Sequence, residues 1–214
     1  MQLNIVQQIA VYALPVMFAI TLHEAAHGYV AKHYGDTTAY MLGRVSLNPL
    51  RHIDPIGTVL IPLLTMMLGG ILFGWAKPVP VNFNYLRNPK KDMLWVALAG
   101  PGANLAMALG WAVVMKLANM MPGNPFSLPM ALMGMAGINV NVVLMVLNLL
   151  PLLPLDGGRI AVSLLPNRLA YRYSLLEPYG MILLVILLFS GVLGTIMLPL
   201  INVTKSLILL LLGI

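Results

Sequence analysis

The sequence predicts an all-α polytopic membrane protein, a bundle of about five to six transmembrane or re-entrant helices with a small membrane-associated β element. Of the 214 residues, 60% are hydrophobic and only 8% are charged, and the mean hydropathy is +0.90, which lies far outside the range of soluble globular domains. Apolar runs long enough to cross a bilayer recur along the chain, and no polar stretch between them is long enough to fold separately. We therefore expect residues 1–214 to form a single transmembrane domain.

The first half of the chain contains two apolar segments. Residues 4–31 form the first, and we expect it to be retained because it lacks the basic region and the small-residue cleavage site of a signal peptide. The polar stretch that follows contains TTAYML and RVSLN, which could be short strands. Residues 56–75 are apolar again, but a proline and several glycines interrupt them, which suits a re-entrant segment as well as a straight span. Prolines at alternate positions then predict an extended edge strand near 79–83.

The second half contains three apolar segments. Residues 93–118 and 129–150 are both long enough to cross a membrane. The prolines at 151 and 154 should end regular helix after the second of them. Residues 179–198 form a further predicted span, which leaves 201–214 as a tail that is short for a crossing of its own.

The formal net charge is +6, yet the basic residues occur singly or in pairs and form no basic stripe, which argues against nucleic-acid binding. Their distribution fits the rule that cytoplasmic loops collect Lys and Arg. Ten of them fall on one side of the expected topology and only Lys116 and Lys205 on the other. The ten are Lys32, Arg44, Arg51, Lys77, Arg87, Lys90, Lys91, Arg159, Arg168 and Arg172. That side is expected to face the cytoplasm and the anionic inner leaflet of the bilayer, with the N-terminus outside.

The stretch HEAAH places His23, Glu24 and His27 inside the first apolar segment. On a helix, positions i and i+4 lie one turn apart on the same face, so both imidazoles can reach one cation. Glu24 projects to the side, where it can act as a general base without binding the metal. The chain has no cysteine, so any metal must be held by His, Asp or Glu. The alternative interpretation is ordinary polar side chains at a helix end, although ionisable residues inside membranes usually mark function.

Asp156 is the best candidate for a third ligand, because a catalytic zinc site normally has three protein ligands and an open position. It follows a helix-breaking proline pair and precedes Gly157 and Gly158, which permit an unusual backbone. It could instead pair with Arg159 as an ordinary helix-end carboxylate. His33 and His52 lie in the polar loop, where solvated histidines are expected.

These stretches together resemble the site-2 protease family of intramembrane zinc metalloproteases. The matching motifs are HEAAH, AGPGAN and NLLPLLPLDGG, and RVSLNPLRHIDPIGT and GWAKPVPVN resemble its compact prokaryotic subgroup without PDZ or CBS domains. The resemblance implies one Zn²⁺ per chain on His23, His27 and Asp156, with Glu24 as the catalytic base. It also implies that Asn148 positions substrate or stabilises the oxyanion, although a helix-packing amide is an equal alternative.

A packing role is favoured for Asn104, because Gly100 and Gly102 beside it suggest a close helix approach. The resemblance further implies a membrane-protein substrate with a transmembrane helix, held in extended form by an exposed strand edge near 79–83 or 44–47. The expected location is the plasma membrane of a prokaryote, with the active site nearer the cytoplasmic side, and a homo-oligomer or a regulatory membrane partner is compatible with the sequence.

If both motifs bind one metal, the segments carrying them should run parallel, with an odd number of crossings between them. The segment at 56–75 should then be re-entrant or otherwise not a full crossing.

Two other functions remain open on the sequence alone. A transporter or channel could use buried His and Asp as an ion path, although this does not explain the Glu between the histidines. A zinc-binding membrane scaffold without proteolysis would also conserve the ligands, and substitution of Glu24 distinguishes it from a protease.

Overall fold

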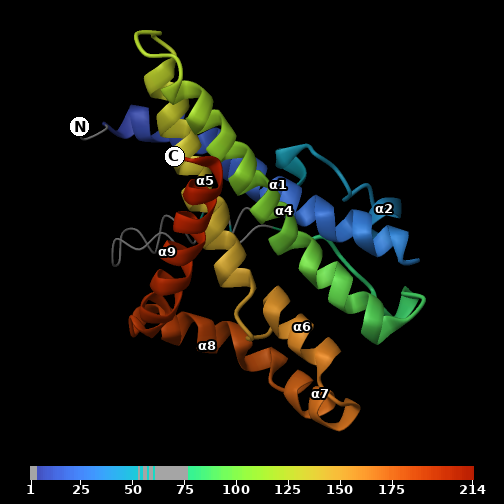
Figure 1. Cartoon of the computed structure of the whole chain (residues 1–214). Coiled ribbons are helices and arrows are strands. Elements are labelled where there is room, and N and C mark those ends of the chain that lie inside the picture. The colour runs from blue at the N-terminus through green and yellow to red at the C-terminus, as the bar shows by residue number, and fades with distance from the viewer. Residues whose placement is uncertain (1–3, 53, 55–56, 58–59, 61–76) are drawn as a thin grey trace.

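The computed structural model describes residues 4–52, 54, 57, 60 and 77–214, and these fold into helices with no strand among them. Figure 1 shows the arrangement. The α-helices are α1 (Ile5–His33), α2 (Thr38–Met41), α4 (Pro89–Asn119), α5 (Ser127–Asn148), α6 (Asp156–Leu164), α7 (Asn167–Ser174), α8 (Glu177–Phe189) and α9 (Val192–Leu212). Two short 3-10 helices, η1 (Pro49–Arg51) and η3 (Phe83–Tyr85), lie in the connections.

Four of the described helices, α1, α4, α5 and α9, are long and apolar enough to cross a membrane, and α7 with α8 would make a fifth as a pair bent by 63°. The all-α polytopic prediction is therefore confirmed for this part of the chain. The predicted re-entrant segment at 56–75 lies almost entirely outside the described residues.

The C-terminal helices divide at a different place from the one predicted. The sequence indicated a span at 179–198 and a short tail after 201. In the structure α8 ends at Phe189 and α9 begins at Val192, so the tail belongs to a 21-residue helix. Gly191 lies between them with φ of +76°, in the left-handed region that glycine adopts without steric cost. Both flanks are equally apolar, so hydropathy alone could not locate this break.

The predicted β element is absent from the described residues. The Asp36 carboxylate accepts hydrogen bonds from the Thr38 backbone N–H and hydroxyl, which starts the turn that becomes α2. In the stretch near 79–83, the Val79 N–H donates to Glu24 and the Asn82 N–H donates to Asp36. Because these backbone groups bond to side chains of α1 and the turn after it, they pair with no neighbouring strand.

Helices α1, α4 and α5 pack together at the centre, and α9 packs against α4 and α5. Helices α4 and α5 form an antiparallel hairpin, while α6 and α7 lie beyond the end of α5 beside the first half of α4 (Figure 1). Glycines allow the hairpin to pack closely, since Gly134 lies against Met115 and Gly137 against the Trp111 ring. Alanines at 108 and 112 are fully buried in the same core. This small-residue packing fixes α4 as the central helix against which the site is built.

Candidate metal centre

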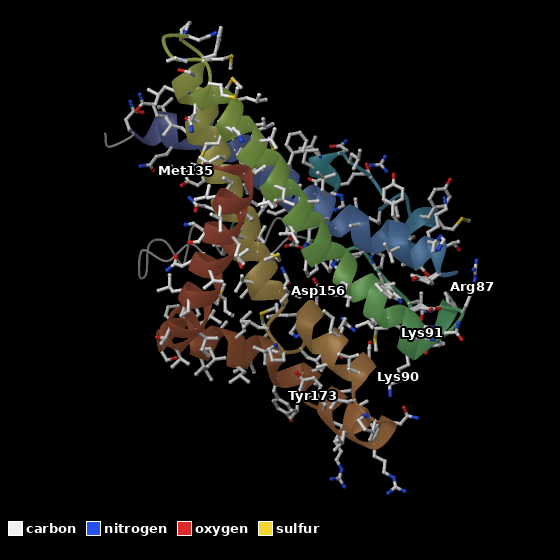
Figure 2. All side chains as sticks on the ribbon, viewed as in Figure 1. Arg87, Lys90, Lys91, Met135, Asp156 and Tyr173 are labelled. Atoms are coloured by element: carbon white, nitrogen blue, oxygen red, sulfur yellow. The ribbon has the colours of Figure 1, made fainter. Side chains whose placement is uncertain are left out.

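Two histidines and an aspartate converge at the centre of the molecule. His23 and His27 lie one turn apart on α1, and their Nε2 atoms are 3.1 Å apart. Asp156, the first residue of α6, places its Oδ2 3.4 Å from each of these nitrogens. Figure 2 shows Asp156 beside the middle of α4. Among the described residues, this is the group of three side chains that could hold a metal ion, and it joins the two distant motifs of the sequence.

The chain delivers Asp156 through a tight turn after α5. Helix α5 ends at Asn148, and residues 149–155 reverse direction before α6 begins. A Cβ atom on Gly157 would collide with the carbonyl oxygens of residues 149 and 150, and one on Gly158 would lie 2.5 Å from the nitrogen of Leu153. The two glycines therefore let the first turn of α6 sit directly on this connection. Their backbone is helical and has no positive φ, so the unusual conformation expected from the sequence is absent and the close approach is what requires them.

Gly100 brings α4 against the two imidazoles. A Cβ atom there would lie 2.7 Å from His23 Nε2 and closer still to His27 Nε2, so a larger side chain would occupy the space between the ligands. Gly102 was expected to serve the same close approach, but a Cβ atom at that position meets no other atom within 4 Å. Only the first of the two glycines is therefore required by the packing.

Each histidine makes a second hydrogen bond through Nδ1. His27 Nδ1 lies 2.7 Å from the carbonyl oxygen of Val96, and His23 Nδ1 lies 2.6 Å from Oδ1 of Asn104. A carbonyl oxygen can only accept, so the Nδ1–H must donate and the Nε2 lone pair is left facing the centre of the group. Such an outer hydrogen bond is the usual partner of a metal-binding histidine.

The three converging atoms fit a zinc ion. Two Nε2 lone pairs and a carboxylate oxygen all accept and none donates, and Asp156 Oδ2 is buried without a hydrogen-bond partner. Zinc–ligand distances near 2.0–2.1 Å in tetrahedral geometry separate ligand atoms by about 3.4 Å. The observed separations of 3.1–3.4 Å match this value.

Glu24 lies beside the group and does not belong to it. Its side chain is half-buried, and its Oε2 accepts a hydrogen bond from the Val79 N–H at 2.7 Å. The backbone N–H of Val79, in a separate segment, thus holds the Glu24 carboxylate next to the three candidate ligands.

Comparison with known proteins identifies the family. The chain is 37% identical over 199 residues to the "Putative zinc metalloprotease YwhC" of Bacillus subtilis, covering 92% of this chain and 88% of that protein. It is 30% identical over 180 residues to the "Putative zinc metalloprotease Rip2" of Mycolicibacterium smegmatis, covering 83% of this chain and 66% of that protein. No family model matches the sequence, and no solved structure matches it.

The chain belongs to the site-2 protease family. The names of its relatives imply zinc, and the His23, His27 and Asp156 group supplies a fitting set of ligands. The relatives and the apolar helices together place this protein among membrane proteins of the zinc metalloprotease class.

Asn148, predicted to act in catalysis, is the last residue of α5 in this site-2 protease homologue. Its amide donates to the carbonyl oxygen of Leu144 one turn earlier, at 3.0 Å. This bond lies within the helix and does not reach the metal ligands, so a catalytic role for Asn148 stays a prediction.

Sequence reasoning missed the amides behind the histidines. Asn104 was expected only to pack, yet it contacts His23, one of the three candidate ligands, and Asn141 on α5 contacts Asn104 in turn. The available signal was an uncharged amide inside each of the apolar segments 93–118 and 129–150, which is costly to bury without a partner. His52 was expected to be solvated but is 2% exposed, with Nε2 2.9 Å from the Ser46 carbonyl oxygen, whereas His33 is exposed as expected.

Proposed function

We propose that this protein is an intramembrane zinc metalloprotease that hydrolyses peptide bonds in or next to transmembrane segments of membrane-protein substrates. The observation that carries the proposal is the three-ligand group with a separate carboxylate, Glu24, beside it on the same helix. Given the rise of a helix, His23 lies about 15 Å from the C-terminal end of α1. The proposed site is therefore located along an apolar helix that can cross a membrane.

In this mechanism His23, His27 and Asp156 would hold one Zn²⁺ per chain. When bound, zinc supplies a Lewis acid that polarises the scissile carbonyl and lowers the pKa of water toward 7. Glu24 accepts a proton from the attacking water and later delivers it to the leaving amine. The Val79 N–H orients the Glu24 carboxylate for this exchange.

Asn148 is proposed to donate a hydrogen bond to the oxyanion or to the substrate backbone. For this it must release the Leu144 carbonyl oxygen, which lies 3.0 Å from its amide nitrogen. A rotation about the side-chain bonds at the end of α5 would accomplish the change.

The proposed substrate is a membrane protein with a transmembrane helix, which must unwind locally before its backbone can enter the site. The relatives are bacterial, and Figure 2 shows three basic residues, Arg87, Lys90 and Lys91, close together around the start of α4. These facts support a plasma-membrane location with the site nearer the cytoplasmic face. Exposed basic groups at that end would contact anionic lipid headgroups.

Glu24→Gln tests the proposal, because it keeps the shape of the side chain and removes its ability to take a proton. Zinc content by mass spectrometry should remain at the wild-type level, while cleavage of a library of synthetic single-span peptides in detergent should fall at least about 10²-fold. Retained cleavage in this variant would remove Glu24 from the mechanism. Wild-type protein that carries zinc but cleaves no member of the library in detergent or lipid vesicles would overturn the proteolytic assignment.

A further inference from the structure

A chain of buried amides continues from His23 on the side away from the ligand group. Asn104 on α4 and Asn141 on α5 are both 0% exposed. Asn104 Nδ2 donates to Asn141 Oδ1 at 3.0 Å and to the Ala19 carbonyl oxygen at 3.3 Å. Asn141 Nδ2 donates in turn to the Gly137 carbonyl oxygen at 2.8 Å. Unpaired amides are costly inside an apolar bundle, and here the two satisfy each other across three helices.

The donor and the acceptor of each hydrogen bond between these amides can be assigned by starting from the Gly137 carbonyl. The Gly137 carbonyl can only accept, so Asn141 must turn its NH₂ group toward it and its oxygen toward Asn104. Asn104 must then offer its NH₂ group to that oxygen and its own oxygen to His23. An amide oxygen only accepts, so His23 carries its proton on Nδ1 and keeps the Nε2 lone pair free.

We infer that Asn104 and Asn141 are positioning residues of the zinc site, which hold His23 in the tautomer and orientation whose Nε2 binds the metal. This inference deepens the proposed function and rests on it. The tautomer of His27 is held directly by the backbone, because its Nδ1 lies 2.7 Å from the Val96 carbonyl oxygen. The two ligands therefore differ, because the His23 tautomer depends on how α5 packs against α4 and the His27 tautomer does not.

Asn104→Leu tests the inference through zinc affinity, which needs no substrate. The variant removes the acceptor for His23 Nδ1 while keeping a side chain of similar size. In full-length detergent-purified protein, a competition titration with a chelator should show Zn²⁺ affinity reduced about 10- to 100-fold. Asn141→Leu leaves Asn104 in place but removes its partner, so the affinity should fall by at least about threefold.

Asn104→Asp separates the hydrogen bond from the packing. The carboxylate keeps an acceptor oxygen for His23 but gives up both donor bonds, to Asn141 and to Ala19. Zinc affinity should therefore stay closer to the wild-type value than in Asn104→Leu, while the melting temperature of the metal-free protein falls. Asn139→Leu is the matched control, since Asn139 is an amide on α5 two residues before Asn141, and its side chain forms no hydrogen bond within the described part of the protein. It should leave zinc affinity unchanged.

Wild-type zinc affinity in Asn104→Leu would overturn the inference, as would an Asn104→Asp variant that binds zinc as weakly as Asn104→Leu. Unchanged zinc affinity in Asn141→Leu would show that Asn141 does not help to position His23. If Asn104→Leu does not fold, NMR of the zinc-loaded wild type with ¹⁵N-labelled histidine decides, because a His23 ring protonated on Nε2 contradicts the inference and one protonated on Nδ1 supports it. Wild-type protein that binds no zinc would instead refute the metal centre and with it the proposed function.

Discussion

Gly100 allows helix α4 to pack directly against the two candidate histidine ligands. Helix α4 passes so close to His23 and His27 that a Cβ atom at residue 100 would fall between their ring nitrogens. We predict that Gly100→Ala weakens zinc binding at least about tenfold, because the methyl group forces the imidazoles or α4 to move, and metal sites depend on sub-ångström placement. Chelator competition on the purified variant measures the loss.

Gly102→Ala provides the control on the same helix. A methyl group there meets no atom within 4 Å, so zinc affinity should remain at the wild-type value. Equal effects of the two alanine substitutions, or a Gly100→Ala variant with undiminished zinc affinity, would show that the close approach of α4 is not what holds the ligands in place.

The side chains of the candidate metal centre could be located from the sequence because the spacing of metal-binding residues is tied to their chemistry. Two histidines four residues apart share a helix face whatever the helix packs against, so His23 and His27 were identifiable without a fold. Asp156 followed from the search for a third ligand. Asn104 and Asn141 were not identifiable in this way, because an amide becomes a histidine partner only through the packing of α1, α4 and α5, and its sequence spacing does not encode that packing.

The first turn of α6 is the element that places Asp156, and it depends on a direct backbone contact. Gly157→Ala should destabilise the protein by about 1–3 kcal/mol, because its Cβ atom collides with the carbonyl oxygens of residues 149 and 150. It should also weaken zinc binding, since any shift of this turn moves the preceding residue. Thermal unfolding and zinc affinity are measured on the same sample.

Gly110→Ala is the comparison for this element. Gly110 lies inside α4, and a Cβ atom there meets nothing within 4 Å. Alanine in a helix interior is favoured over glycine by about 0.5–1 kcal/mol, so this variant should be at least as stable as wild type. Loss of stability in Gly110→Ala as large as that in Gly157→Ala would mean that the alanine effects do not report the backbone contact.

At the scale of elements, the lengths of the apolar runs located the long helices α4 and α5 but not the partners or the breaks of the helices. The spans at 93–118 and 129–150 agree closely with α4 and α5. The boundary at Gly191 escaped prediction because apolar residues flank it on both sides. The short strands failed for another reason, since the backbone near Val79 and Asn82 bonds to carboxylates of residues 24 and 36, contacts that no local pattern reports.

At the scale of the whole molecule, the metal centre connects parts of the chain that are otherwise joined by few contacts. His23 and His27 come from α1, and Asp156 comes from α6, which packs on α4 and α7. Bringing two lone pairs and a carboxylate together without a cation is unfavourable, because all three atoms are acceptors. An ion bound to these three side chains is therefore expected to stabilise the packing of α6 on the bundle.

Metal removal should consequently lower the stability of the entire fold. An ion that binds only the folded state stabilises it by about 4 kcal/mol when its free concentration is a thousand times its Kd. We predict that stripping zinc with a chelator lowers the melting temperature of the detergent-purified protein, and that adding Zn²⁺ restores it.

His23→Ala and Asp156→Ala should contain little zinc, and their melting temperatures should not respond to added Zn²⁺, because each has lost one of three ligands. Fluorescence of Trp111, which packs against Gly137 where α4 meets α5, reports the transition. A melting temperature that is the same with and without zinc, or an Asp156→Ala variant stabilised as strongly as wild type, would contradict a site that ties α6 to α1.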